Sequence, residues 1–204
     1  MLQGSNLACV RGDRRLFKDV NFTLEAGTLM QVHGPNGSGK TSLLRILCGL
    51  SNPALGEITW NGTGIRTLGY EYLSNLTYIG HLSGTKDDLT VLENIRISSA
   101  LAGMQITEAQ ARKALAYMGL KGRELLPAKV LSQGQRRRVA LARLLVCKTK
   151  LWILDEPLAA LDVMAVKLIQ RLLERHLADE GMVIMTTHQD IEVTTFSKVN
   201  LKLA

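Results

Sequence analysis

The sequence predicts an α/β fold in which a mostly parallel β-sheet is covered by helices on both faces. Short apolar runs of strand length recur along the chain, at residues 29–32, 151–154 and 182–186. Longer stretches with apolar residues at helical spacing follow them, at residues 41–50 and 164–177. This alternation of strands with helices, along 204 residues, predicts one domain of ordinary size.

The N-terminal third of the chain predicts a further, antiparallel β part. Between residues 17 and 24, apolar residues alternate loosely with polar ones, as in a strand with one solvated face. Residues 57–60 also resemble a strand, and the Asn61-Gly62 dipeptide that follows favours a tight hairpin turn. We therefore expect short antiparallel strands beside the parallel sheet.

A small helical lobe is predicted at about residues 88–145, inserted into a core formed by residues 1–87 and 146–204. Helical stretches within it are predicted at residues 91–102, 107–118 and 135–146. Thr107, followed three residues later by Gln110, favours a capping box at the start of the second stretch. The whole chain is thus expected to be one domain with an insertion.

The composition narrows the classes of function. The net charge is +7, but the basic residues are spread along the chain, and the densest cluster, residues 136–138, does not form a separate tail. No nucleic-acid partner is therefore expected. No apolar run approaches the ~20 residues of a membrane-spanning helix, and no signal peptide is evident, so a cytoplasmic location is expected. The three cysteines form no Cys-x-x-Cys pair and are expected to be buried thiols.

The clearest chemical motif predicts a phosphate-binding loop that matches G-x-x-x-x-G-K-[ST]. It consists of Gly34, Pro35, Asn36, Gly37, Ser38, Gly39, Lys40 and Thr41. Glycines let main-chain N–H groups curl around phosphate oxygens, and the helix that follows offers its positive N-terminal end to the anion. Lys40 is expected to reach the β- and γ-phosphates of a bound nucleotide, and the Thr41 hydroxyl is expected to hold Mg²⁺.

Two further motifs indicate the class of nucleotide-binding protein. Residues 131–135 read Leu-Ser-Gln-Gly-Gln, and residues 151–157 read Leu-Trp-Ile-Leu-Asp-Glu-Pro, an apolar strand that ends in two acids. With the phosphate loop, they resemble the signature sequence and the Walker B strand of the ATP-binding-cassette (ABC) ATPases. Gln133 departs from the usual Leu-Ser-Gly-Gly-Gln, at a position that varies in the family.

The resemblance implies roles in ATP hydrolysis for residues of these motifs. Asp155 would hold Mg²⁺ together with Thr41, and Glu156 would polarise the attacking water as general base. His188, which follows the strand at residues 182–186, resembles the switch histidine that contacts the γ-phosphate. A nucleotide-binding module without hydrolysis is the alternative, and the presence of both Glu156 and His188 argues against it.

The signature sequence implies a head-to-tail dimer. A serine hydroxyl, a glycine N–H and a helix N-terminus form a second anion site, which one chain cannot place against its own phosphate loop. In the family, two cassettes pack head to tail. The resemblance therefore implies that Ser132, Gly134 and Gln135 close over the ATP that a second copy of the chain holds. Asp162 resembles the aspartate of the D-loop, which reports across the same dimer interface.

Two positions depart from the family pattern. His81 occupies the place of a glutamine that usually contacts Mg²⁺ and water, and either a polar role beside ATP or a surface histidine without a catalytic part is possible. Arg11, directly before Gly12, stands where the family usually has an aromatic residue that stacks on adenine. A guanidinium plane can also stack on a base.

Within the ABC ATPases, residues 79–81, 151–157 and 186–189 resemble the ATP-binding subunits of bacterial cytochrome c maturation (haem exporter) systems. The resemblance implies a peripheral subunit on the cytoplasmic face of the inner membrane, docked on integral membrane subunits. Its ATP hydrolysis would drive haem export or the release of a haem-loaded chaperone. An ABC ATPase subunit for another cargo, or a soluble ABC ATPase that acts on ribosomes or DNA, is the alternative.

Overall fold

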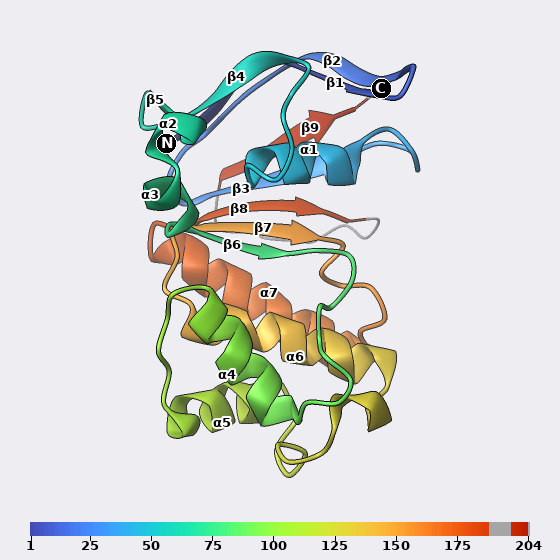
Figure 1. Cartoon of the computed structure of the whole chain (residues 1–204), viewed down its shortest axis with the longest axis vertical. Helices are drawn as coiled ribbons and strands as arrows, with labels where there is room; N and C mark the ends of the chain where they lie inside the picture. The colour runs from blue at the N-terminus through green and yellow to red at the C-terminus, as the bar shows by residue number, and fades with distance from the viewer. Residues whose placement is uncertain (188–196, 204) are drawn as a thin grey trace.

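The computed structural model of the chain describes residues 1–187 and 197–203, and it contains two β-sheets with helices between and beside them (Figure 1). The antiparallel sheet has the strand order β2-β1-β4-β5. Its strands are β1 (Leu2–Arg11), β2 (Arg14–Leu24), β4 (Leu55–Trp60) and β5 (Thr63–Gly64). The predicted hairpin joins β4 to β5, because Trp60 pairs with Thr63 across Asn61 and Gly62.

The second sheet has five strands in the order β6-β7-β8-β3-β9, and all its pairings are parallel. Its strands are β3 (Thr28–His33), β6 (Leu76–Ile79), β7 (Leu151–Asp155), β8 (Met182–Thr186) and β9 (Ser197–Lys202). The central strands β7 and β8 are buried along their whole length. A strand covered on both faces favours apolar residues at successive positions, which explains the continuous apolar runs in the sequence.

Helices lie on both faces of the parallel sheet (Figure 1). They are α1 (Lys40–Leu47), α2 (Ile65–Leu68), α3 (Tyr70–Leu73), α4 (Val91–Leu101), α5 (Glu108–Tyr117), the 3₁₀ turn η1 (Ala128–Val130), α6 (Gln133–Val146) and α7 (Val163–Ala178). Helix α1 covers one face of the sheet, α6 and α7 cover the other, and further helices pack beside them. Helix α1 packs between the two sheets, in the core that contains Met30 and Ile184. Helices α4 to α7 bury their apolar faces in the other core, which contains Leu29 and Val183. The predicted α/β class with an antiparallel N-terminal part is confirmed.

The helical segment contains the expected capping box. The Thr107 hydroxyl accepts a hydrogen bond from the Gln110 N–H at 3.2 Å, and the Gln110 side chain accepts one from the Thr107 N–H at 2.8 Å. Helix α6 begins at Gln133, two residues before the predicted start, because Ser132 caps it. The limits of the inserted lobe, at residues 88 and 145, stay a prediction.

Some elements were not predicted. Helices α2 and α3 are single turns, too short to show a clear apolar period. Strand β9 lies at an edge of its sheet and is mostly exposed, with two lysines and an asparagine among its residues, so it lacks an apolar run. The three cysteines are free and buried, as expected. In the described part of the chain, no helix is both long and apolar enough to span a membrane.

Candidate functional site

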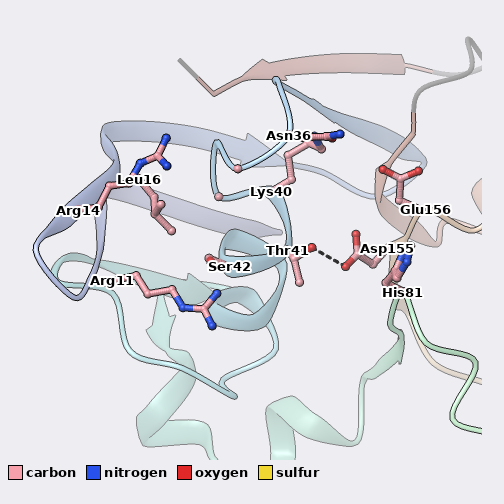
Figure 2. Close-up of a pocket in the computed structure, with 12 residues that line it drawn as sticks. Arg11, Arg14, Leu16, Asn36, Lys40, Thr41, Ser42, His81, Asp155 and Glu156 are labelled. Atoms are coloured by element: carbon pink, nitrogen blue, oxygen red, sulfur yellow. Dashed lines mark hydrogen bonds between the residues drawn. The ribbon is translucent and has the colours of Figure 1, made fainter.

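A cleft of about 590 Å³ lies where β3 and β7 end (Figure 2). It is lined by Arg11, Arg14, Leu16, Asn36, Gly37, Gly39, Lys40, Thr41, Ser42, His81, Asp155 and Glu156. The fold therefore brings the predicted phosphate loop together with the predicted acid pair, from segments far apart in the sequence. Arg14, Leu16 and Ser42 also line the cleft, although no motif singled them out.

The phosphate loop connects the end of β3 to the first residue of α1. Gly39 is the N-cap of α1 in the left-handed conformation, with φ of 98°, and no side chain caps the helix. The N–H groups of the first turn are consequently available to an anion. A Cβ atom on Gly39 would lie 3.0 Å from the Leu16 Cβ and from the Phe17 ring. Glycine is thus required here both by backbone conformation and by the close approach of β2.

The Lys40 ammonium is held over the phosphate loop. Its Nζ donates hydrogen bonds to the carbonyl oxygens of Gly34 at 2.7 Å and of Pro35 at 3.2 Å. An ammonium group has three N–H donors, so this arrangement leaves one to point toward a phosphate oxygen. The loop backbone therefore orients the cation before a nucleotide arrives.

The Asp155 carboxylate lies at the end of β7 and is almost fully buried. One oxygen accepts a hydrogen bond from the Thr41 hydroxyl at 2.8 Å (Figure 2). The other accepts one from the Thr186 hydroxyl at 2.7 Å. The two residues predicted to hold Mg²⁺ are thus in contact. A carboxylate and a hydroxyl are hard oxygen donors, which fits Mg²⁺ held by few protein ligands together with phosphate oxygens and water.

Glu156 follows directly and has an unusual backbone conformation. Its φ is 52°, in the left-handed region that residues with a Cβ rarely adopt. Its N–H donates a hydrogen bond to the Thr186 hydroxyl oxygen at 2.9 Å. Such strained residues cluster at functional sites, where the surrounding structure holds them in place.

His81, which is exposed, lines the same cleft.

A buried arginine that sequence reasoning missed lies behind the two acids. Arg137, on α6, is 4% exposed and donates hydrogen bonds to main-chain carbonyls next to His81 and Glu156. Burial lowers the pKa of its guanidinium, while the nearby charges of Asp155 and Glu156 oppose that shift. The sequence signal was the helical spacing of Arg137 with the buried Ala140 and Leu141, which places it on the inward face of α6.

The signature residues lie at the N-terminus of α6. Ser132 is the N-cap: its hydroxyl accepts a hydrogen bond from the Gln135 N–H at 3.2 Å, and its N–H donates to the Gln135 side chain at 3.0 Å. Gly134 packs against the segment before α7, since a Cβ atom there would lie 2.5 Å from the Ala160 carbonyl oxygen. The signature and D-loop motifs are therefore in contact within one chain.

Asp162 caps α7 and pairs with α6. One carboxylate oxygen accepts a hydrogen bond from the Ala165 N–H at 2.8 Å, and the other pairs with the Arg138 guanidinium. None of Ser132, Gly134, Gln135 and Asp162 is among the described residues that line the cleft. The signature residues and Asp162 thus lie apart from the phosphate loop of their own chain.

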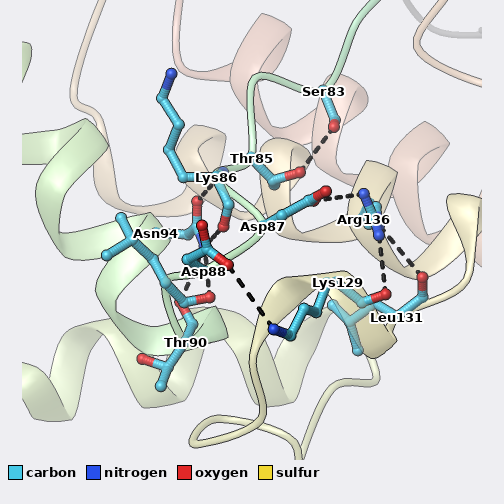
Figure 3. A network of polar contacts seen from close by, with 11 residues as sticks. Ser83, Thr85, Lys86, Asp87, Asp88, Thr90, Asn94, Lys129, Leu131 and Arg136 are labelled. Atoms are coloured by element: carbon cyan, nitrogen blue, oxygen red, sulfur yellow. Dashed lines mark hydrogen bonds and ion pairs between the residues drawn. The ribbon is translucent and has the colours of Figure 1, made fainter.

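Hydrogen bonds and an ion pair connect the segment that follows His81 to helices α4 and α6 (Figure 3). The Lys86 N–H donates a hydrogen bond to the Asn94 side chain at 2.7 Å, and Asp87 pairs with the Arg136 guanidinium at 2.6 Å. His188, predicted as the switch histidine, lies outside the described residues.

Comparison with known proteins places the chain in a family. The family profile described as ABC transporter matches residues 17–159. A cytochrome c biogenesis ATP-binding export protein CcmA of Nitrosospira multiformis is 66% identical, over 99% of this chain and 98% of the relative. The CcmA protein of Nitrosomonas europaea is 64% identical, over 100% of this chain and 96% of the relative.

Solved structures agree with the fold and with nucleotide binding. The dimeric post-hydrolysis structure of the cassette MJ0796, bound to ADP and Pi, has a TM-score of 0.82 at 25% identity and covers 100% of this chain and 96% of its own. A putative ABC transporter ATP-binding protein of Pyrococcus furiosus has a TM-score of 0.84 at 25% identity and covers 99% and 96%. The chain belongs to the ABC transporter ATPases and, among them, to the CcmA family of cytochrome c biogenesis ATP-binding export proteins.

Proposed function

We propose that this chain binds and hydrolyses ATP as the energy-supplying subunit of an exporter in c-type cytochrome biogenesis. The observation that carries the proposal is the cleft, which joins the phosphate loop to the Asp155–Glu156 pair. The relatives named as cytochrome c biogenesis export proteins, up to 66% identical over nearly the whole chain, support the cellular role. ATP binding alone needs only the loop, whereas hydrolysis also needs the acids.

In this proposal the triphosphate lies along the loop of residues 34–41, with its phosphates at the open N-terminus of α1. Lys40 donates to the β- and γ-phosphates. The adenine lies toward Arg11, which lines the same cleft from the end of β1. A guanidinium can stack on the base in the absence of an aromatic residue there.

Mg²⁺ is held in this proposal by the Thr41 hydroxyl and by Asp155, directly or through water. When bound, the ion neutralises charge on the phosphate oxygens. The existing hydrogen bond between Thr41 and Asp155 supports the assignment, because it already places the two oxygen donors 2.8 Å apart. Thr186 holds the other carboxylate oxygen, so the orientation of Asp155 does not depend on Thr41 alone.

Glu156 is the proposed general base, and its position after the magnesium-binding aspartate supports that role. It accepts a proton from the water that attacks the γ-phosphate. His81 and His188 are proposed to contact the same water or the γ-phosphate. His81 supports this by lining the cleft with Asp155 and Glu156.

The active form is proposed to be a head-to-tail homodimer. Ser132, Gly134 and Gln135 of each chain would cover the ATP of the other, with Asp162 at the same interface. The dimeric MJ0796 structures support a dimer. ATP hydrolysis would drive conformational changes in integral membrane subunits of the cytochrome c maturation complex. The chain would lie against these subunits on the cytoplasmic face of the inner membrane.

The substitution Glu156→Gln tests the hydrolytic function. We expect ATP turnover to fall by about 10²- to 10⁴-fold, the usual contribution of a general base, while ATP still binds and traps the dimer. ATPase rate, ATP affinity and dimer content are measured together. Glu25→Gln, at an exposed acid in the turn before β3, is the matched control and should keep wild-type turnover. Wild-type turnover in Glu156→Gln would refute the general-base role.

The cellular role is tested by complementation. In a bacterium whose own CcmA gene is deleted, the wild-type chain should restore c-type cytochromes, detected by haem staining, and Glu156→Gln should not. Restoration of cytochromes by Glu156→Gln would separate the biogenesis role from ATP hydrolysis. Failure of the wild-type chain, at normal expression, would favour an ABC ATPase subunit for another cargo.

A further inference from the structure

Arg137 lies in a group of main-chain carbonyls at the ends of two strands. Its Nη1 donates to the Gly80 oxygen at 2.7 Å, and its Nη2 donates to the oxygens of Asp155 at 2.6 Å and Glu156 at 2.9 Å. Longer contacts of 3.4 Å reach the carbonyls of His81 and Pro157. A buried guanidinium is costly unless its donors are satisfied, and here main-chain oxygens satisfy them.

These carbonyls belong to the two segments that carry cleft residues. Strands β6 and β7 are parallel neighbours, and Ile79 and Leu154 are their last paired residues. Gly80 and Asp155 follow these residues, at the point where hydrogen bonds between β6 and β7 end and no longer join the two segments. The planar guanidinium group donates hydrogen bonds to carbonyls of both segments at once. A single ammonium group cannot do this with the same geometry.

The contacts also bear on the strained backbone of Glu156. The Asp155 carbonyl belongs to the peptide group before the Glu156 Cα, and the Glu156 carbonyl belongs to the peptide group after it. Arg137 Nη2 bonds both oxygens, so it fixes the peptide planes on either side of a residue with φ of 52°. A residue with a Cβ keeps a left-handed backbone conformation only when surrounding contacts fix it. The hydrogen bonds from Arg137 fix the backbone of Glu156 in this way.

We propose that Arg137 is a positioning residue for ATP hydrolysis, which fixes the main chain of Glu156 and ties it to the main chain that leads into His81. The proposal rests on the proposed general-base role of Glu156. Arg137 does not line the cleft itself, so it acts through the backbone rather than on the nucleotide. It also joins α6, whose N-terminus carries the signature residues, to the proposed base.

The neighbouring Arg136 shows that this arrangement is specific to one position on the helix. Arg136 pairs with Asp87 and donates to the carbonyls of Lys129 and Leu131, all outside the cleft (Figure 3). Its side chain is more exposed than that of Arg137, at 28%. Arg136 is therefore a matched control on the same turn of α6.

The test is Arg137→Lys in the full-length chain, within the assembly in which the wild type hydrolyses ATP. The charge stays near Asp155 and Glu156, but the bonds that span both strands are lost. We expect kcat to fall by about 10- to 100-fold, the size of effect that a misplaced catalytic group produces. The KM and Kd for ATP should stay within about twofold, because the phosphate loop is untouched. Arg136→Lys should keep kcat within about twofold of wild type.

Arg137→Gln provides a second variant if Arg137→Lys does not fold, and it should show the same split between kcat and KM. Unchanged kcat in both variants would overturn the proposal. So would a fall in ATP affinity as large as the fall in kcat, with earlier thermal unfolding, because that pattern describes a role in folding. Glu156→Gln, measured in parallel, keeps the two ideas apart: if it loses turnover while the Arg137 variants do not, only the positioning role fails.

Discussion

Two helix N-termini, those of α1 and α6, bear the residues proposed to bind ATP, and they differ in how they are capped. The α1 N-terminus follows Gly39 and has no side-chain cap, whereas Ser132 and Gln135 cap α6 reciprocally. Both ends present N–H groups and a positive dipole. The first is open to a phosphate within its own chain, whereas at the second the Ser132 hydroxyl already accepts a hydrogen bond from the Gln135 N–H.

This difference assigns distinct tasks to the two ends. The free N–H groups of the uncapped α1 end can bond water or an anion, so this end is suited to bind the nucleotide first. The capped α6 end is stable without ligand, and the Ser132 hydroxyl can accept from the Gln135 N–H while donating its own hydrogen outward. The α6 end is therefore suited to join a nucleotide that a second chain already holds.

Of the two helix ends, the open end of α1 should give the larger effect when it is altered. Lys40→Met removes the ammonium that lies over the loop and should weaken ATP binding by about 10- to 100-fold, the range for hydrogen bonds to charged groups. Isothermal titration calorimetry with ATP measures the change. Lys113→Met, at an exposed lysine of α5, is the control and should bind like wild type. Unchanged affinity in Lys40→Met would mean that the loop is not the main binding element.

Gly134→Ala should affect the second end and leave the first intact. The added Cβ would lie 2.5 Å from the Ala160 carbonyl, so the start of α6 and the segment before α7 must separate. ATP affinity of the single chain should stay unchanged, while turnover of the dimer falls by about 10-fold or more through misplacement of the signature. Gly64→Ala is the control, because its Cβ would meet no atom nearer than 3.7 Å. Equal turnover in the two variants would contradict a role for the α6 end.

The sequence predicted the phosphate loop and α1 better than the residues that contact Asp155 and Glu156 from behind. A glycine-rich loop between an apolar strand and an amphipathic helix has a local pattern, so residues 34–41 and α1 could be placed directly. The spacing of Arg137 with Ala140 and Leu141 indicates the buried face of α6, but it does not identify the partners of Arg137, because main-chain carbonyls carry no side-chain signature. Contacts such as that of Thr186 with Asp155 also depend on strand order, which composition and spacing do not reveal.

The smallest expected effect separates capping from catalysis. Ser132→Ala and Thr107→Ala each remove the side chain of a capping box, at α6 and at α5, and each should lower the free energy of unfolding by about 1 kcal/mol. Chemical denaturation measures that loss. Because only α6 is proposed to contact the ATP of a second chain, only Ser132→Ala should also reduce turnover of the dimer. If both variants lose turnover equally, the effect follows from helix stability, and the Ser132 hydroxyl has no separate part in binding the partner's nucleotide.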